Sequence, residues 1–262
     1  MAELTFQDGS EAVRRLPKRL QEVMQLPEWQ SRIFVAGGFI RAVIAGEPVS
    51  DIDVFVKSPA DAEALAIKLA GISPETYAHL ISRTKAGVLV TENAITLESF
   101  NPVVQIIHKY TFQSAVDVVN NFDFSVCCAA IWYGEQTTID GNVQPYSHMG
   151  WGSYCDARFY PDLAARRLIY RRPDRAENAG SSLLRVLKFY QRGYLIDTEQ
   201  FAAVVARLMA SYSPTLEYKL SEEHIQEGLV NLFNPPAPQS LEPKVNSVTA
   251  PKYVRIGCAT KY

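Results

Sequence analysis

The chain has 262 residues, of which 47% are hydrophobic and 21% charged, and its formal net charge is −2. This composition is typical of a globular protein and argues against a strongly basic protein that coats nucleic acid. No stretch approaches the ~20 apolar residues of a membrane helix. The first fifteen residues contain no apolar segment of the signal-peptide type. We therefore expect a cytoplasmic protein without a membrane partner.

The first part of the chain has apolar residues at helical spacing that alternate with short apolar runs. Pro17 must lie early in its helix or kink it, and Gly46 and Gly71 are placed to end helices. In chain order we expect a helix over 10–27, a strand over 32–36, a helix over 39–45, a strand over 51–56 and a helix from 58–61 to Gly71.

From Tyr77 onward β-branched residues become frequent, and from about Pro161 the pattern is helical. We expect strands over 88–90, 94–97 and 103–110, helices over 114–120 and 124–130, and a small hairpin over 132–139 that turns at Gly134-Glu135. Helices over 162–170, 179–193, 198–210 and 222–232 follow. Proline-rich residues 233–262 have little to bury. This pattern predicts an α/β head over 1–172, a helical annex over 173–232 and a poorly structured tail.

The strongest candidate site combines Gly37 and Gly38, Arg41, and the pair Asp51 and Asp53. Side chains alternate across a strand, so the two carboxylates point to the same face. Such a pair is costly unless a cation neutralises it, and Mg²⁺ prefers oxygen ligands of this kind. The glycines let the backbone approach a bulky anion. These residues predict a site for a metal-bound nucleoside triphosphate.

Here the sequence resembles a known family. The string GGFIRAVIAGEPVSDIDVFV is similar to the start of the head domain of poly(A) polymerases and bacterial-type CCA-adding tRNA nucleotidyltransferases, in the DNA polymerase β-like superfamily. Further motifs follow in the family's order: residues 122–126 resemble its RRDFTINAL motif, residues 162–169 its DLxxxxIR stretch, and residues 184–197 its LRxxRF…GFxID helix. The resemblance extends over about residues 30 to 200.

The resemblance implies an α+β fold, namely a polymerase β-like head with a mixed, antiparallel-rich sheet and flanking helices, followed by a small helical domain. It implies transfer of a nucleoside monophosphate from an NTP to a hydroxyl acceptor, with an RNA 3′ end as the foremost acceptor and Mg²⁺ or Mn²⁺ as cofactor. By resemblance, the catalytic metal ligands are Asp51 and Asp53, and the nucleotide-binding residues are Gly37, Gly38, Arg41, Asp123, Arg185 and Lys188.

Several positions depart from the family pattern. Ala42 replaces an acidic residue, and Asn121 and Phe122 replace two arginines, which removes positive charge near the nucleotide. Gln105 stands where many relatives have a third carboxylate, and an amide is a weaker cation ligand and a poor general base. The alternative hypothesis is a catalytically degenerate module that binds nucleotide or RNA. A small-molecule or protein acceptor also stays open. A dinucleotide-binding fold fits poorly, because the third glycine of G-x-G-x-x-G is missing.

A basic excess supports an RNA or triphosphate partner. Between residues 158 and 192, nine Lys and Arg residues stand against three acidic ones. Such a segment attracts polyanions, although charge runs are often only solvated helix faces.

Overall fold

The computed structural model describes residues 2–81, 87–138, 146–171, 179–212 and 221–233. The chain divides into two compact units. The first unit consists of residues 1–122 and 126–163, and the second of residues 123–125 and 164–262. The predicted tail from residue 234 onward lies outside the described residues. The domain boundaries inferred from the sequence stay a prediction.

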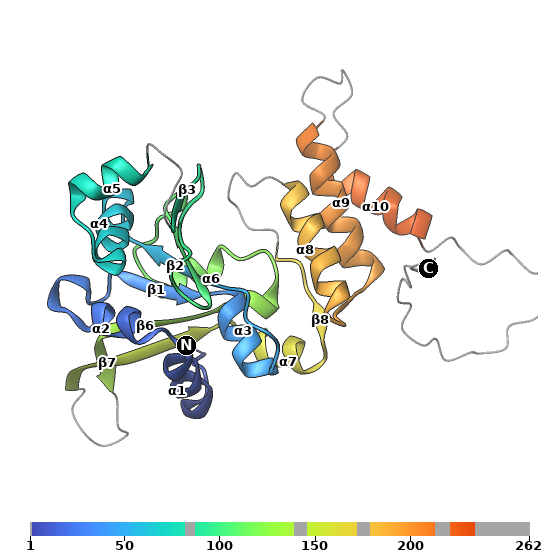
Figure 1. Cartoon of the computed structure of the whole chain (residues 1–262). Helices are drawn as coiled ribbons and strands as arrows, with labels where there is room; N and C mark the ends of the chain where they lie inside the picture. Colours follow the sequence, from blue (N-terminus) through green and yellow to red (C-terminus); the bar gives the residue numbers. More distant parts are fainter. Residues whose placement is uncertain (1, 82–86, 139–145, 172–178, 213–220, 234–262) are drawn as a thin grey trace, which may run out of the picture. The chain divides into compact units, whose positions relative to one another are not determined.

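A seven-stranded sheet is the centre of the first unit (Figure 1), with strand order β3-β4-β5-β2-β1-β6-β7. All neighbouring strands are antiparallel except β2 and β5, which are parallel. The predicted α+β class with a mixed, antiparallel-rich sheet and flanking helices is therefore confirmed. The strands are β1 (Ile33–Ala36), β2 (Asp51–Val56), β3 (Val88–Val90), β4 (Ala94–Leu97), β5 (Val103–Ile107), β6 (Ala129–Thr138) and β7 (Tyr146–Cys155).

Most helices up to residue 164 begin and end where local signals place them. Pro17 separates α1 from α2, Ser58 Oγ accepts from the Asp61 N–H at the start of α4, and Gly46 and Gly71 end α3 and α4 in the left-handed conformation. The helices are α1 (Phe6–Arg15), α2 (Lys18–Gln25), α3 (Gly38–Ala45), α4 (Pro59–Ala70), α5 (Pro74–Ile81), α6 (Ala115–Asn120) and α7 (Phe159–Ala164), with 3₁₀ turns η1 (Pro27–Trp29) and η2 (Ser125–Cys127).

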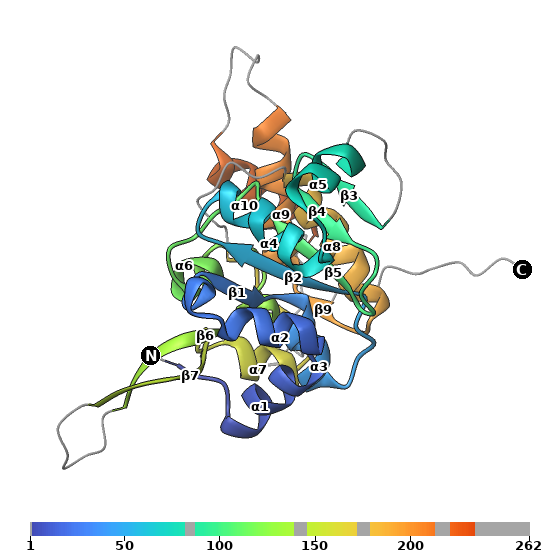
Figure 2. The same cartoon turned by 60° about the vertical axis from the view of Figure 1, so that its left-hand side comes forward.

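One face of the sheet packs against α6. Phe34, Phe55 and Ala130 from three strands form a buried cluster with Val118 and Val119 of α6. Asp53 is two residues before Phe55 on β2, so alternation puts its side chain on this same face. Figure 2 shows β1 and β2 side by side in the sheet. The α6 side of the sheet is therefore the side that carries the predicted acidic residues.

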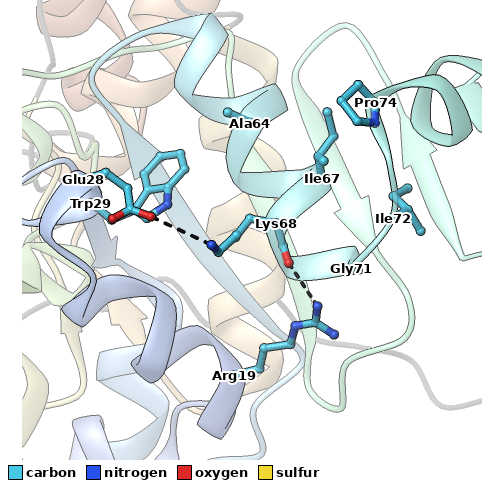
Figure 3. A pocket seen from close by; sticks show the side chains of 9 residues that line it. All are labelled: Arg19, Glu28, Trp29, Ala64, Ile67, Lys68, Gly71, Ile72 and Pro74. Carbon is cyan, nitrogen blue, oxygen red and sulfur yellow. Dashed lines mark hydrogen bonds and ion pairs between the residues drawn. The ribbon is translucent and has the colours of Figure 1, made fainter.

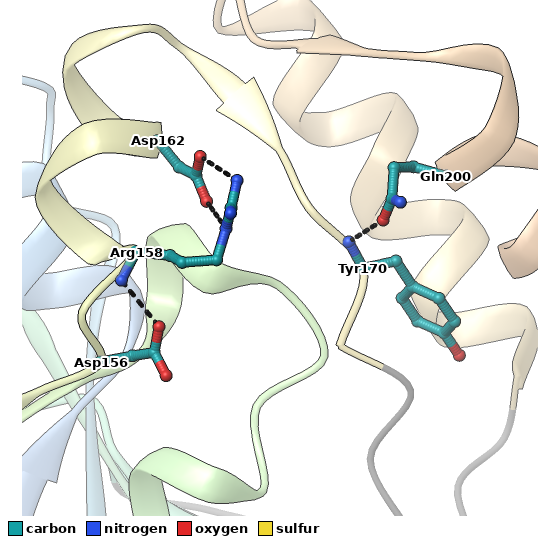
Figure 4. A network of polar contacts seen from close by, with 5 residues as sticks. All are labelled: Asp156, Arg158, Asp162, Tyr170 and Gln200. Atoms are coloured by element: carbon teal, nitrogen blue, oxygen red, sulfur yellow. Dashed lines mark hydrogen bonds and ion pairs between the residues drawn. The ribbon is translucent and has the colours of Figure 1, made fainter.

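The second unit contains the remaining helices and a two-stranded parallel pair. Its elements are β8 (Arg167–Leu168), α8 (Ala179–Gln191), β9 (Leu195–Ile196), α9 (Thr198–Tyr212) and α10 (Glu222–Phe233). Phe124 packs against Phe189 of α8, with ring centroids 5.8 Å apart. The Tyr170 N–H donates to Gln200 Oε1 at 2.8 Å (Figure 4). In the part of the chain that the structure describes, no helix has the length and apolarity needed to cross a membrane.

Several local predictions were wrong. The one helix expected over 10–27 is divided into α1 and α2, because Pro17 interrupts it. Residues 77–81 belong to helix α5, because Pro74 at its start and the buried Tyr77 favour a helix. Residues 124–130 form a 3₁₀ turn and the start of β6, and residues 167–168 form β8 instead of continuing a helix. The apolar run 124–130 has no hydrophobic periodicity that would distinguish a buried strand from a buried helix.

A further error concerns residues 132–139. Gly134 lies inside a long strand instead of a turn, and β6 pairs along its whole length with β7. A Cβ at Gly134 would collide with Ser31 Oγ, so the glycine allows the neighbouring loop to approach the strand.

A candidate metal and triphosphate site

Asp51 and Asp53 lie at the first and third positions of β2. Both are partly exposed, whereas Ile52 between them is fully buried on the other face. The Ser50 hydroxyl donates to Asp51 Oδ1. The sheet therefore holds two partly exposed carboxylates on one side of a rigid strand, as the sequence predicted.

The glycine turn lies beside these carboxylates because β1 and β2 are antiparallel. Ala36, the last residue of β1, is opposite Asp53, so the chain enters Gly37 next to the acidic end of β2. Gly37 has φ of 79°, a conformation that favours glycine, and precedes the first residue of α3. The unpaired N–H groups of a helix start favour a bound anion. A helix start of the kind that favours an anion therefore lies beside the acidic pair of β2.

Arg41 is one helical turn into α3, but its side chain is only 4% exposed. Its Nε lies 3.2 Å from Glu47 Oε2, in a pair whose partner is also buried. A Cβ built on Gly38 would lie 3.8 Å from Arg41 Nη1, so the guanidinium reaches back toward the start of α3. The structure thus keeps a positive charge near the glycine turn. The sequence analysis missed Glu47, six residues after Arg41, as its partner.

Gln105 is the register partner of Asp53 on the neighbouring strand β5. Paired residues of adjacent strands share a face, so the amide stands directly beside the acidic pair, as the sequence predicted. Among the described residues, no three His, Cys, Asp or Glu side chains gather to hold a metal ion. Mg²⁺ is often bound through one or two carboxylates plus substrate phosphates. Asp51, Asp53 and the Gln105 amide oxygen fit such a partial ligand set.

Phe122 packs against the same turn. Its ring atoms would lie 3.0 Å from a Cβ on Gly37, and its centroid is 5.9 Å from that of Phe55 in an edge-on arrangement. At a position where the resembled family has an arginine, this chain therefore places an apolar ring against the glycine turn. Because Gly37 has no side chain, the Phe122 ring has room to pack there.

The second unit brings together two of the three remaining predicted residues. The Asp123 side chain is 1% exposed and pairs with Arg185 Nη1 of α8. Ser182 Oγ, one turn earlier on α8, donates to Asp123 Oδ2 at 2.8 Å. A buried carboxylate held by a guanidinium and a hydroxyl is a strong anchor between residue 123 and α8. Ser182, at i−3 from Arg185, was not identified from the sequence.

Lys188 lies on the exposed side of α8 and is the third predicted residue of this group. Other basic residues of the segment 158–192 have contacts within the protein. Arg158 forms a double hydrogen bond with the buried Asp162, through Nε at 3.1 Å and Nη2 at 3.2 Å (Figure 4). Arg166 Nη1 donates to the Arg192 carbonyl at 2.9 Å. The basic excess is therefore used partly for folding. Arg172 and Arg175 lie outside the described residues.

An open groove of about 570 Å³ lies elsewhere in the first unit (Figure 3). Trp29 and Ile67 contribute to its apolar lining. Arg19 Nη2 donates to the Lys68 carbonyl at 3.0 Å, and Lys68 Nζ lies 3.8 Å from Glu28 Oε1. The groove contains none of the predicted site residues, and its charged groups contact one another. It is therefore separate from the acidic pair.

Among solved structures, the chain is similar to CCA-adding enzymes at low sequence identity. The Thermotoga maritima CCA-adding enzyme complexed with tRNA_CCA is 16% identical, with a TM-score of 0.45, over 76% of this chain and 44% of that one. A CCA-adding enzyme in apo form I is 15% identical, with a TM-score of 0.46, over 80% of this chain and 46% of that one. The chain thus spans less than half the length of these structures. No curated protein matches it.

A family model matches the chain more directly. Residues 13–166, more than half of the 262 residues, match the model described as Gabija anti-defense 2 family protein. The matched region includes the glycine turn, the acidic pair on β2, Gln105 and Asp123. The chain therefore belongs to the Gabija anti-defense 2 family.

Proposed function

We propose that this protein is a metal-dependent nucleotidyltransferase. The observation that carries the proposal is the arrangement of Asp51 and Asp53 on one side of β2, directly beside the glycine turn that begins α3. Carboxylates next to an anion-binding turn are what a metal–triphosphate complex requires. The order of motifs along the sequence supports the same reaction class.

In this proposal Asp51 and Asp53 hold Mg²⁺ or Mn²⁺, with the Gln105 amide as a neutral neighbour. When bound, the metal neutralises phosphate charge and lowers the pKa of an attacking hydroxyl. The N–H groups at the start of α3 and the guanidinium of Arg41 stabilise the triphosphate. The oxygen of the acceptor hydroxyl would form a bond to the α-phosphorus while the bond from the α-phosphorus to the oxygen that bridges to the β-phosphate breaks. Pyrophosphate would then leave, and the hydroxyl proton would pass to solvent. The acceptor that the motif resemblance and the basic excess favour is an RNA 3′ end.

Nucleotide recognition by Asp123, Arg185 and Lys188 is part of this proposal. In the second unit Asp123 Oδ2 accepts from both Arg185 and Ser182. In this proposal Asp123 contributes to nucleotide recognition by holding Arg185 of α8 in place, while Lys188 is exposed for phosphate or RNA contacts. The family name describes action against the Gabija defence, and we propose nucleotidyl transfer as the reaction through which this member acts.

The test is incubation of the full chain with each of four labelled NTPs, Mg²⁺ or Mn²⁺, and an RNA pool. We expect incorporation into RNA with at least one nucleotide, abolished by a chelator of divalent metals. Arms without RNA, or with a protein or small-molecule acceptor, identify the acceptor class. Absence of incorporation in every arm would overturn the catalytic proposal.

A second candidate function is a module that binds nucleotide without turnover. Two observations favour it: Gln105 replaces a carboxylate beside Asp53, and the Phe122 ring lies against Gly37. Binding of an NTP by calorimetry, without incorporation in the assay above, is the result expected of such a module.

Gln105→Glu separates these two functions. The added carboxylate would lie beside Asp53 and complete an acidic triad, so we expect tighter Mg²⁺ binding by about tenfold, since a charged ligand is worth ~1.4 kcal/mol or more. If the wild-type protein only binds nucleotide, the variant should gain transfer activity. If the wild-type protein is already an active enzyme with Gln105, the rate of transfer should change little. Titration of metal in the transfer and nucleotide-binding assays measures both effects. Gln113→Glu, an exposed glutamine change, is the matched control. Unchanged metal affinity in Gln105→Glu would argue against a metal at this position.

A further inference from the structure

Strand β7 is the outer strand of the seven-stranded sheet and pairs on one side with β6. β1 pairs with β6 at Phe34–Ala36 against Ala130–Trp132, so the rest of the β6–β7 ribbon extends beyond β1. Figures 1 and 2 both show this ribbon projecting from the sheet. The backbone groups on the outer side of β7 are therefore placed to accept another strand.

The parity of the ladder identifies which backbone groups point outward. The Ser31 N–H donates to the Tyr133 carbonyl at 2.8 Å, on the side of β6 away from β7. Tyr133 and its partner Trp151 are therefore a non-hydrogen-bonded pair, and the N–H and C=O of Trp151 point outward. The same parity applies to Ser147, Met149, Ser153 and Cys155. In the part of the chain that the structure describes, the outward backbone groups of Ser147, Met149, Trp151 and Ser153 have no hydrogen-bond partner.

The N-terminal segment occupies one end of this edge. The Cys155 N–H donates to the Ala2 carbonyl at 3.0 Å, which confirms the outward parity. Tyr160 keeps this segment in place, because its Oη accepts from the Thr5 N–H and donates to Asp8 Oδ2. Burial and the Asp8 carboxylate raise the pKa of Tyr160 to about 12, so its donated proton is retained. The open part of the edge is thus Tyr146–Tyr154.

The residues of this open edge lack the usual protection against strand pairing. From 146 to 155 the strand contains no Lys, Arg, Asp, Glu or Pro. Charged residues and proline are the common means by which outer strands avoid pairing with another chain. Two copies of this edge would meet without like charges opposite each other.

The sequence of the edge is nearly symmetric about Gly150. It reads Y-S-H-M-G-W-G-S-Y over residues 146–154, with Tyr and Ser at equal distances on both sides. Antiparallel pairing of two copies centred on Gly150 puts Ser147 opposite the second copy's Ser153, and Met149 opposite its Trp151. All these residues have outward N–H and C=O groups, so every free group in the edge finds a partner.

We propose that this edge binds a second copy of the chain, joining two sheets through antiparallel β7–β7 pairing centred on Gly150. Side chains support the same register. Met149 is 44% exposed, and Trp151 packs edge-on against Tyr133 with centroids 5.5 Å apart. In the dimer the Met149 thioether of each copy contacts the Trp151 ring of the other, a favourable sulfur–aromatic contact. The non-hydrogen-bonded Gly150 pair has the closest backbone approach.

The first experiment measures the molar mass of the full chain by light scattering over a concentration series. We expect a dimer whose fraction rises with concentration. Met149→Pro removes an outward N–H without removing a bond to β6, so it should give a monomer with unchanged far-UV circular dichroism. Met149→Ala keeps the N–H and should still dimerise. A wild type that is monomeric throughout, or a Met149→Pro variant that remains dimeric, would overturn the proposal.

The second experiment tests the register. In a background with Cys258→Ser, Gly150→Cys puts two thiols opposite each other at a Cα separation of about 4.5 Å, within the range that a disulfide spans. Oxidation should give a covalent dimer on non-reducing gels. Ser147→Cys, an exposed position opposite Ser153, should not crosslink. Crosslinking of Ser147→Cys but not of Gly150→Cys would disprove pairing centred on Gly150. A strand from a different protein would leave both variants uncrosslinked, and this result too would overturn the proposal.

Discussion

The Asp51→Ala/Asp53→Ala variant is expected to lose nucleotidyl transfer by about 1,000-fold or more. Such a loss corresponds to about 4 kcal/mol of transition-state stabilisation, which is in the range supplied by a bound metal ion. Both carboxylates are partly exposed and neither belongs to the buried apolar cluster, so their removal should leave the core intact. Removing two neighbouring negative charges should not lower the melting temperature. Incorporation of labelled NTP measures the loss.

The matched control is Glu63→Ala/Glu75→Ala, which removes two exposed carboxylates of α4 and α5. It should transfer at the wild-type rate. Single Asp51→Asn and Asp53→Asn variants keep side-chain size while removing one charge each, and each should reduce transfer and raise the Mg²⁺ concentration needed for half-maximal rate. Transfer that persists in the double alanine variant would show that the acidic pair is not the metal site.

Arg185→Ala is expected to destabilise the protein by about 3 kcal/mol. Asp123 is 1% exposed, and removing its partner leaves a buried carboxylate without compensation. Ser182→Ala should cost less, about 1 kcal/mol, because it removes one hydrogen bond to the same carboxylate. Urea unfolding followed by circular dichroism measures both changes.

Lys188→Ala is the control for stability, since Lys188 is exposed on the same helix. It should change the unfolding free energy by less than about 0.5 kcal/mol. Asp123→Asn/Arg185→Met removes both charges together and should recover part of the loss, because no unpaired charge remains. A stable Arg185→Ala protein would mean that the pair with Asp123 contributes little to folding.

Local signals in the sequence were strong enough to predict the parts of the fold nearest the acidic pair. The glycine after β1, the helix that Gly46 ends and the β2 strand with its two aspartates depend on backbone conformation and side-chain alternation, which are short-range properties. The α+β class with an antiparallel-rich sheet followed from the motif resemblance. The place of Gln105 beside Asp53 followed from the motif resemblance, and the parallel register of β2 and β5 confirmed it.

Long-range contacts explain where prediction failed. Gly134 has the features of a turn residue, yet Ser31, more than one hundred residues earlier, packs against it inside a strand. The strand β7 contains four residues that favour flexible backbone or solvent, namely Ser147, Gly150, Gly152 and Ser153. Its pairing with β6 supplies the stabilisation that its own sequence lacks. β propensity depends on such neighbours.

The sequence by itself determined the chemical inventory: two carboxylates at alternate strand positions, a glycine turn and a nearby arginine. Their proximity required the tertiary structure, because antiparallel pairing of β1 and β2 sets Ala36 opposite Asp53. The structure also decided that Arg41 pairs with Glu47 and that Asp123 pairs with Arg185 and Ser182. Residue types specify which bonds are chemically available, whereas the geometry of packed elements selects the partners that a buried charge must find.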